Sequence, residues 1–201
     1  MIIECAGLPG AGKTTICRLV KHPHGGKSSV PLSALRPSGA MLRVAWQIFL
    51  LSATARPLQL KRLKRGFNLT VFLRHYLDHD RDVLLDQGVV QKLWSMLADA
   101  EAWPAERLRA VLQNLRPFAP DHVVWLETPL EMAAARMASR SGGRSRYDGL
   151  NPQQATAILL QRAGLLEMLA RDFSAETGAR LVVFDGLRDP AVNAARIDAL
   201  F

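Results

Sequence analysis

The feature that constrains this chain most is a glycine-rich stretch from Gly7 to Thr14, with the letters GLPGAGKT. A short apolar run precedes it, and residues 13–21 carry a helical pattern that stops before Pro23. Glycines let a backbone turn its N–H groups inward, and the first turn of a helix adds partial positive charge. The spacing Gly-x-x-x-x-Gly-Lys-Thr between a strand and a helix therefore predicts a loop that binds phosphate groups.

Each residue type in this loop has an expected contact. Lys13 is placed to reach the β and γ phosphates of a nucleoside triphosphate, and the Thr14 hydroxyl to ligate Mg²⁺. A merely structural glycine-rich turn would not need the lysine and the threonine. We therefore predict a site for ATP and Mg²⁺. The residues expected to contact the nucleotide here are Gly7, Pro9, Gly10, Ala11, Gly12, Lys13, Thr14 and Thr15.

Three more segments are mostly apolar and have the length of strands, at residues 83–85, 122–126 and 180–184. Amphipathic helical patterns separate them, which is typical of an α/β domain whose parallel sheet is covered on both faces. Helices are expected to begin at Thr128-Pro129, Asn151-Pro152 and Asp189-Pro190. One helical face over 41–53 is expected to face the core, with Leu42, Ala45, Trp46, Phe49, Leu50 and Ala53.

A single carboxylate follows the second strand. Asp86 comes directly after the run 83–85 and is followed by Gln87 and Gly88. Ligands of parallel sheets bind at the carboxyl ends of the strands, so Asp86 is expected to lie near the phosphate loop if its strand is a neighbour of the first one. There it would hold a Mg²⁺-bound water or accept a proton from an attacking hydroxyl. The alternative is an aspartate that only caps the turn.

Arginines are concentrated in one later segment. Arg136, Arg140, Arg144 and Arg146 occur within eleven residues, interrupted by the pair Gly142-Gly143. Arginines on a closing segment stabilise the charge that spreads over a phosphoryl group during transfer. The tract is therefore expected to act as a lid, with a solvated basic helix end as the alternative.

A second basic cluster, Lys61 to Arg65, lies between two helical patterns and precedes Gly66. Its ordinary interpretation is a solvated face or a helix end. The functional alternative is a contact surface for an anionic acceptor.

Composition bounds the class of protein. The 201 residues are 49% hydrophobic, which suits one substantial core and a single domain over 1–201. Two cysteines inside predicted elements give no disulfide framework. The longest apolar run, residues 44–53, is far shorter than a bilayer span. We therefore expect a soluble, cytoplasmic protein with no membrane partner.

The formal net charge is +8, which favours phosphorylated or polyanionic partners. Aromatic residues make up only 6% of the chain, which leaves little for a platform that stacks bases. Nucleic acid is therefore not an expected partner, and a small-molecule phosphoryl acceptor is preferred.

Taken in order, these motifs resemble those of the P-loop nucleoside and nucleotide kinases, especially thymidylate-kinase-like members. The resemblance rests on the loop at Gly7 to Thr14, on Asp86-Gln87-Gly88, and on the run 123–129 followed by the arginine tract. It implies a three-layer α/β/α fold with a five-stranded parallel sheet, with ATP as donor and Mg²⁺ as cofactor. It also implies an acceptor-side helical region over about 28–81 and a lid over about 136–150.

The same resemblance implies roles for particular residues. Asp86 would lie at the acceptor, Arg136 against the adenine, and Asp185 and Gly186 beside the base. The variable positions of the phosphate loop hold no arginine, so the lid would supply the catalytic one. The implied catalytic residues are Lys13, Asp86, Arg140, Arg144 and Arg146, with Thr14 and Asp86 at the metal.

One position departs from the family pattern. Thymidylate kinases carry an arginine directly after the acidic residue, and this chain has Gln87, whose neutral amide does not pair with phosphate in that way. A nucleoside, a nucleotide, a sugar or another hydroxyl acceptor therefore stays open. Two other classes also stay open, a regulatory NTPase switch and a kinase of nucleic-acid ends, as does a homodimer.

Overall fold

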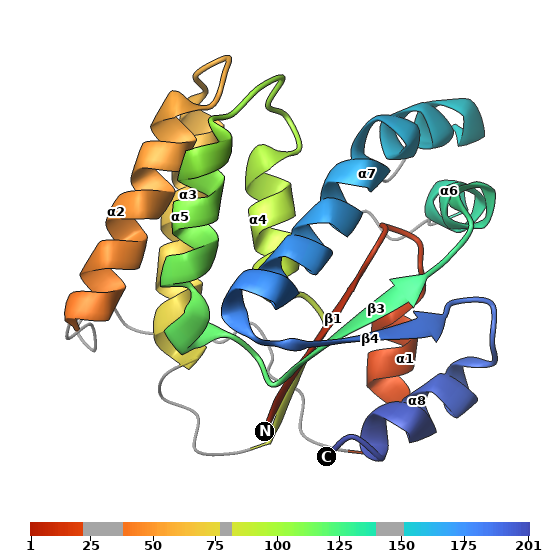
Figure 1. Ribbon diagram of the computed structural model, residues 1–201. Helices are drawn as coiled ribbons and strands as arrows, with labels where there is room; N and C mark the ends of the chain where they lie inside the picture. Colours follow the sequence, from red (N-terminus) through yellow and green to blue (C-terminus); the bar gives the residue numbers. More distant parts are fainter. Residues whose placement is uncertain (22–37, 77–81, 140–150) are drawn as a thin grey trace.

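The centre of the molecule is a parallel sheet of four strands in the order β2-β1-β3-β4, which lies between two layers of helices (Figure 1). This computed structural model describes residues 1–21, 38–76, 82–139 and 151–201. The strands are β1 (Ile2–Gly7), β2 (Val83–Leu85), β3 (His122–Glu127) and β4 (Arg180–Asp185). Three of them match the predicted apolar runs, and β1 extends into the glycine-rich loop. The predicted α/β class is therefore confirmed.

The sheet differs from the expectation in its number of strands. Five were implied by the family resemblance, and the described residues form four. Residues 38–76 between β1 and β2 are mostly helical, so these described residues supply no further strand to the sheet.

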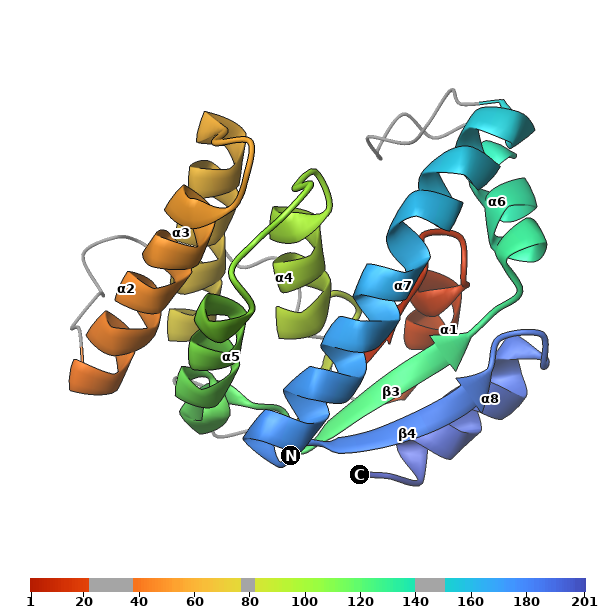
Figure 2. The same cartoon turned by 45° about the horizontal axis from the view of Figure 1, so that its top comes forward.

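Helices cover both faces of the sheet (Figures 1 and 2). Helices α1 and α8 pack together on one face, and α7 with α4 and α5 covers the other. A hairpin of α2 and α3 packs outside α4 and α5, and α6 packs on α7. The bounds are α1 Lys13–Leu19, α2 Gly39–Thr54, α3 Leu60–Tyr76, α4 Val89–Leu97, α5 Ala105–Asn114, the 3-10 helix η2 Arg116–Phe118, α6 Leu130–Ala138, α7 Pro152–Thr177 and α8 Pro190–Asp198.

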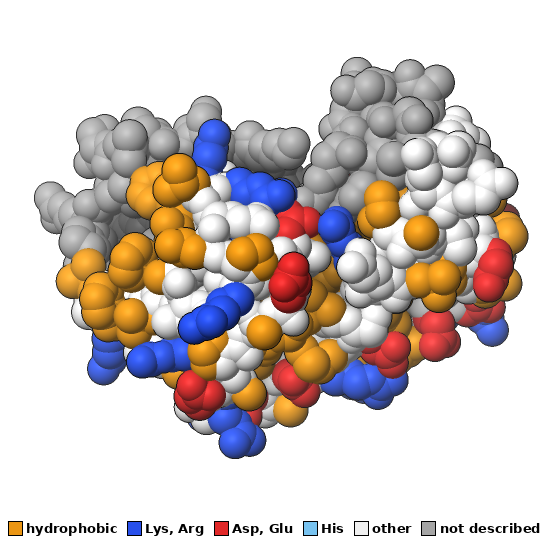
Figure 3. Space-filling model, turned by 90° about the horizontal axis from the view of Figure 1, so that it is seen from above, with side chains coloured by type: hydrophobic (Ala, Val, Ile, Leu, Met, Phe, Trp, Pro, Cys, Tyr) orange, Lys and Arg blue, Asp and Glu red, His pale blue; other side chains and the backbone are white. Residues whose placement is uncertain are grey.

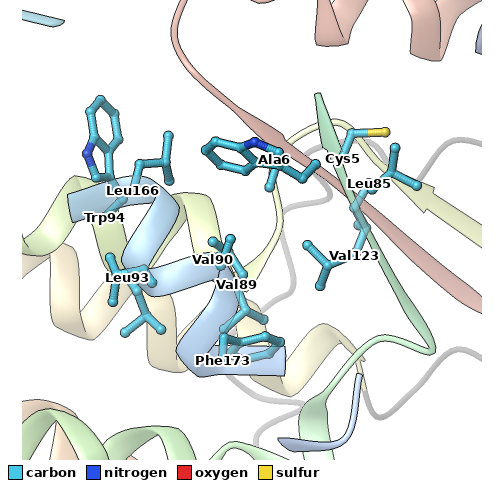
Figure 4. Packing of buried hydrophobic residues seen from close by; sticks show 14 of the residues in the cluster. Cys5, Ala6, Leu85, Val89, Val90, Leu93, Trp94, Val123, Leu166 and Phe173 are labelled. Carbon is cyan, nitrogen blue, oxygen red and sulfur yellow. The ribbon is translucent and has the colours of Figure 1, made fainter. Parts of the chain in front are cut away.

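The main core lies between the sheet and the layer of α4 and α7. Figure 4 shows Val90 and Leu93 of α4 and Phe173 of α7 packing in this layer beside strand residues such as Val123. All four are buried. This packing fixes α4 on the sheet, so the turn between β2 and α4, which carries Asp86, has a defined place.

Helices begin at all three predicted places, and two of the three predicted N-caps are confirmed. Asn151 forms a capping box with Gln154 at the start of α7, and the Asp189 carboxylate accepts a hydrogen bond from the backbone N–H of Ala191 at the start of α8. Thr128 does not cap α6, whose N-cap residue is Pro129. Its hydroxyl donates instead to the Ala11 carbonyl in the glycine-rich loop, at 3.4 Å.

The predicted core face of α2 is wrong. Its buried residues include Met41, Val44, Ile48 and Leu51. The predicted face turns outward instead and exposes Leu42, Trp46 and Phe49. The error arises because α2 is apolar on both sides, so periodicity alone does not select the side that packs.

The basic cluster at Lys61 to Arg65 has a structural role in α3. Arg62 is buried, and its guanidinium donates to the carbonyls of Ala55, Pro57 and Asp99. The Asp99 carboxylate pairs with Arg65 at 2.7 Å, with Arg162 at 2.9 Å and with Lys61 at 3.4 Å. Neither a solvated face nor an acceptor surface describes Arg62 and Arg65, which tie the hairpin to α4 and α7.

Burial alone would raise the pKa of Asp99, but the hydrogen bond and charge of Arg65, with the charges of Arg162 and Lys61, lower it below its ordinary value. Asp99→Ala would leave Arg65 and Arg162 half-buried without their common partner. We expect a loss of about 2–3 kcal/mol in the free energy of unfolding, measured by urea denaturation. The matched control is Glu101→Ala on the exposed surface nearby, which should change stability by less than about 0.5 kcal/mol. Equal losses in the two variants would contradict the role of Asp99.

None of the helices in the described ranges has the length and apolar character needed to cross a bilayer.

Candidate active site

The glycine-rich loop lies at the carboxyl end of β1, which is an inner strand between β2 and β3, and it leads directly into α1. Lys13 is buried, and its ammonium group donates to the carbonyl oxygens of Gly7 at 2.7 Å and Leu8 at 2.9 Å. The lysine is thus held against the backbone of the loop. A phosphate group bound by the loop would offer the ammonium group oxygen acceptors in place of these two carbonyls.

The loop is held tightly against α6. Gly10 has a φ of +89°, and a Cβ atom at this position would lie 2.1 Å from the carbonyl oxygen of Ala133. Any side chain at Gly10 would therefore push α6 away from the loop. The helix that leads into the arginine tract is in this way coupled directly to the backbone of the glycine-rich loop.

The structure brings the two predicted parts of the metal site together. Asp86 follows β2, which pairs with β1, and it lies beside the start of α1. The Thr14 hydroxyl donates to Oδ2 of Asp86 at 2.8 Å, although the two residues are 72 positions apart in the chain. An aspartate that only capped its own turn would not need this contact.

The second oxygen of Asp86 is the observation that fits a metal or an acceptor. Oδ1 is buried and has no hydrogen-bond partner within the described part of the chain. A buried carboxylate oxygen without a partner is costly, so its site is suited to a donor that arrives with a ligand. No group of three or more His, Cys, Asp or Glu side chains gathers as a metal site among these residues. One carboxylate and one hydroxyl are nevertheless sufficient for Mg²⁺ that arrives with nucleotide phosphates.

Glu4 is a site residue that the sequence analysis missed. It lies in β1, is fully buried, and accepts hydrogen bonds from the backbone N–H groups of Val89, Val90 and Gln91, which open α4. Gly88 makes room for it, because a Cβ atom there would lie 2.2 Å from the Glu4 carboxyl carbon. The signal in the sequence was a glutamate inside an otherwise apolar strand, because a buried carboxylate needs hydrogen-bond donors.

Through these bonds Glu4 fixes the turn that presents Asp86. Burial raises the pKa of Glu4 to about 7, while the hydrogen bonds from Gln91, Val89 and Val90 and the charge of Lys92 act in the opposite direction. The folded protein therefore binds a proton at Glu4 between about pH 4.5 and 7 that the unfolded chain releases. The stability from this group is largest below pH 4.5 and falls as the pH rises through 7.

Glu4→Gln should remove this titration. Relative to the wild type, the variant is expected to gain up to about 3 kcal/mol in the free energy of unfolding as the pH rises from about 5 to 8. The measurement is urea denaturation of both proteins across this pH range. The slopes of the free energy of unfolding against pH are compared, so that any pH-independent effect of the amide on stability cancels. Exposed Glu131 supplies the control, Glu131→Gln. Parallel stability curves for wild type and Glu4→Gln would contradict the assignment.

Arg136 closes the other side of the loop. Its guanidinium donates to the carbonyl of Ala11 at 3.4 Å and to that of Gly186 at 3.3 Å. Asp185 accepts from the backbone N–H of Leu187, and its own carbonyl accepts from buried Asn193. The predicted base-contacting loop and Arg136 are thus adjacent to each other and to the phosphate loop. Their contacts with a nucleotide stay a prediction.

An open pocket of about 460 Å³ adjoins this loop, between α7 and the carboxyl ends of β3 and β4. Apolar side chains of Leu8, Trp125, Ala163 and Leu187 contribute to its lining. The pocket therefore offers apolar surface beside Asp185, where a planar base would need it.

Three residues of the predicted lid, Arg140, Arg144 and Arg146, lie outside the described residues, together with the glycine pair between them.

The two cysteines beside the loop, Cys5 and Cys17, are both free and buried, as packing residues are. The hydrogen bond with Cys17, together with burial, raises the pKa of the Cys5 thiol well above its ordinary value, which disfavours a reactive thiolate.

Among solved structures, this chain is similar to three of deoxyadenosine kinase from M. mycoides. One holds the products dCMP and a flexible dCDP, another holds dCTP and a third holds dATP. The TM-scores are 0.55, 0.55 and 0.54 at 13% identity, and the alignments cover 100% of this chain and 97–98% of those chains. The chain thus shares its three-layer α/β/α fold with these structures.

Among curated proteins, the chain is 26% identical over 168 residues to the Holliday junction branch migration complex subunit RuvB of Chlorobaculum tepidum. The alignment covers 81% of this chain and 41% of that protein, so the chain spans about two fifths of the length of this relative. No protein-family model matches the chain.

Proposed function

We propose that this chain is an ATP-dependent phosphotransferase that moves the γ-phosphoryl group of Mg²⁺–ATP to a small-molecule acceptor, a nucleoside, a nucleotide or a similar metabolite. The observation that carries the proposal is the 2.8 Å hydrogen bond between Thr14 and Asp86, which joins the phosphate loop to a strand-end carboxylate. Phosphoryl transfer needs both a grip on the phosphates and a base at the acceptor hydroxyl.

Each group then has a defined task. Lys13 and the loop N–H groups bind the phosphates, and Thr14 with Asp86 holds Mg²⁺, which when bound neutralises charge on the transferred group. Oδ1 of Asp86 accepts the proton of the acceptor hydroxyl as the hydroxyl oxygen attacks the γ-phosphorus atom, the bond to the β–γ bridging oxygen breaks, and ADP leaves. Arg136 and the loop at Asp185 and Gly186 hold the adenine.

The lid over about 136–150 supplies the remaining positive charge. Arg140, Arg144 and Arg146 lie on it, and in this proposal they stabilise the transferred phosphoryl group when the lid closes. The acceptor binds on the side of the helical region over about 28–81. Gln87 is exposed beside Asp86 and carries no charge, which favours an acceptor that presents a hydroxyl at this position over one that presents a phosphate.

The test uses the purified chain with γ-labelled ATP, Mg²⁺ and a panel of nucleosides, nucleotides and sugars. Transfer of label to at least one of them is the expected result. Label released only to water, with a rate that depends on a protein partner, would replace the proposal with a regulatory NTPase. Label transferred only to DNA or RNA ends would replace it with a nucleic-acid kinase.

A further inference from the structure

The outward face of the α2–α3 hairpin, residues Gly39–Tyr76, is apolar and aromatic. Trp46 of α2 is 57% exposed, and its ring stacks on that of Phe49 with the ring centroids 5.6 Å apart. In Figure 3 hydrophobic side chains gather at the left, where α2 lies in Figure 1. The large apolar side chains exposed on this hairpin and its turn are Leu42, Trp46, Phe49, Leu58, Leu60 and Phe67. A group of this size marks an interaction surface.

Helical spacing orders these side chains on two faces. Leu42, Trp46 and Phe49 follow the i, i+4, i+7 pattern and lie along the side of α2 opposite its buried residues. On α3, Leu60 and Phe67 show the same pattern, with the exposed Lys64 between them. On α3 the exposed face therefore carries a long cationic side chain between two apolar ones.

The charge carried by the hairpin itself has one sign, although exposed Glu101 lies next to it and donates its backbone N–H to the Arg56 carbonyl. The sequence holds no aspartate or glutamate between Glu4 and Asp78, so the whole hairpin is free of acidic residues. Arg43 and Arg56 are exposed on it together with Lys64. A partner must therefore match apolar side chains and positive charge together.

These features decide among three kinds of partner. A second copy would bring two positive, acid-free faces together, which costs energy through like-charge repulsion. A nucleic acid would satisfy the cations, but aliphatic Leu42, Leu58 and Leu60 contribute little to phosphate contacts. An anionic lipid surface satisfies both, because apolar side chains enter the acyl boundary while arginine and lysine reach the phosphates.

We propose that the outer face of the α2–α3 hairpin binds an anionic membrane surface. Trp46 and Phe49 insert at the boundary between headgroups and acyl chains, and Arg43, Arg56 and Lys64 contact lipid phosphates. Helix α2 has 16 residues, about 24 Å of helix, and lies in the plane of the surface without crossing it. The sequence-based expectation of no membrane partner weighed only spanning segments, and this proposal is independent of the proposed phosphotransferase activity.

The test is flotation of the full chain with phosphatidylcholine vesicles, with and without about 30% phosphatidylglycerol. We expect binding to the anionic vesicles that is at least about ten-fold stronger than to the neutral ones, and that weakens between about 0.05 and 0.5 M salt. The double variant Trp46→Ser/Phe49→Ser should bind at least about ten-fold more weakly. Because both residues are exposed, its urea midpoint is expected to stay close to that of the wild type.

The matched control is Leu160→Ser/Val192→Ser, which removes two exposed apolar side chains from α7 and α8 and should bind as the wild type does. Absence of binding to anionic vesicles at low salt would overturn the proposal, as would equal binding by the Trp46 and Phe49 variant. A wild-type dimer that this variant converts to a monomer would assign the face to a second copy. Binding to short DNA or RNA that the same variant loses, without vesicle binding, would assign it to nucleic acid.

Discussion

Asp86→Asn is expected to leave ATP binding within about two-fold of the wild type and to lower the turnover of phosphoryl transfer by about 10²- to 10⁴-fold. Asparagine has the same shape, and its side-chain oxygen still accepts the hydrogen bond from Thr14. It cannot take a proton from an acceptor hydroxyl. Calorimetry with a non-hydrolysable ATP analogue measures the binding, and label transfer measures turnover.

The matched control for Asp86 is Asp172→Asn, which makes the same chemical change at an exposed position on α7. It should leave both binding and turnover unchanged. If Asp86→Asn transfers label at the wild-type rate, Asp86 is not the base. If it loses ATP binding and turnover together, its role lies in holding the loop and the metal.

The sequence was sufficient to predict the fold class because the decisive elements are buried strands. Residues 83–85, 123–126 and 181–184 are apolar without alternation, a pattern typical of strands covered on both faces. In the structure β2 and most of β3 are buried, whereas β4 is partly exposed. Parallel strands end on one side of a sheet, so the sequence could place Asp86 near the glycine-rich loop on the condition that the two strands are neighbours. The pairing of β1 with β2 and the Thr14–Asp86 hydrogen bond came from the structure.

The face of α2 could not be predicted in this way. Met41, Val44, Ile48 and Leu51 form one apolar stripe, and Leu42, Trp46 and Phe49 form another. Periodicity identifies a stripe but does not say which of two packs against neighbours. Contacts of α2 with α3 and α5 selected the first, and no local signal in the sequence encodes those contacts.

The burial of two charged residues, Glu4 and Arg62, was also not predicted from the sequence. Glu4 sits inside an apolar run and Arg62 inside a basic one, and both are buried with backbone groups as partners. Their partners lie on other elements, at α4 for Glu4 and at the carbonyls of Ala55, Pro57 and Asp99 for Arg62. The sequence shows that a charged residue stands at an unusual position, but only the packed structure shows which backbone N–H or carbonyl groups it bonds.

Lys13→Ala is expected to weaken binding of Mg²⁺–ATP by about 30-fold or more and to abolish measurable label transfer. The ammonium group is buried beneath the loop and donates to the carbonyls of Gly7 and Leu8, so its charge is fixed where the phosphates would lie. Alanine removes the charge and leaves these two carbonyls without their donor. The same two measurements apply, calorimetry and label transfer.

The control for Lys13 is Lys21→Ala, an exposed lysine just beyond the other end of α1, which should bind and transfer as the wild type does. Lys13→Arg separates charge from fit. It keeps the cation, but the larger guanidinium does not fit the buried space of an ammonium group, so it should restore little of the activity. ATP affinity that is unchanged in Lys13→Ala would mean that the loop does not bind the triphosphate, and the assignment of every other residue around it would then lose its basis.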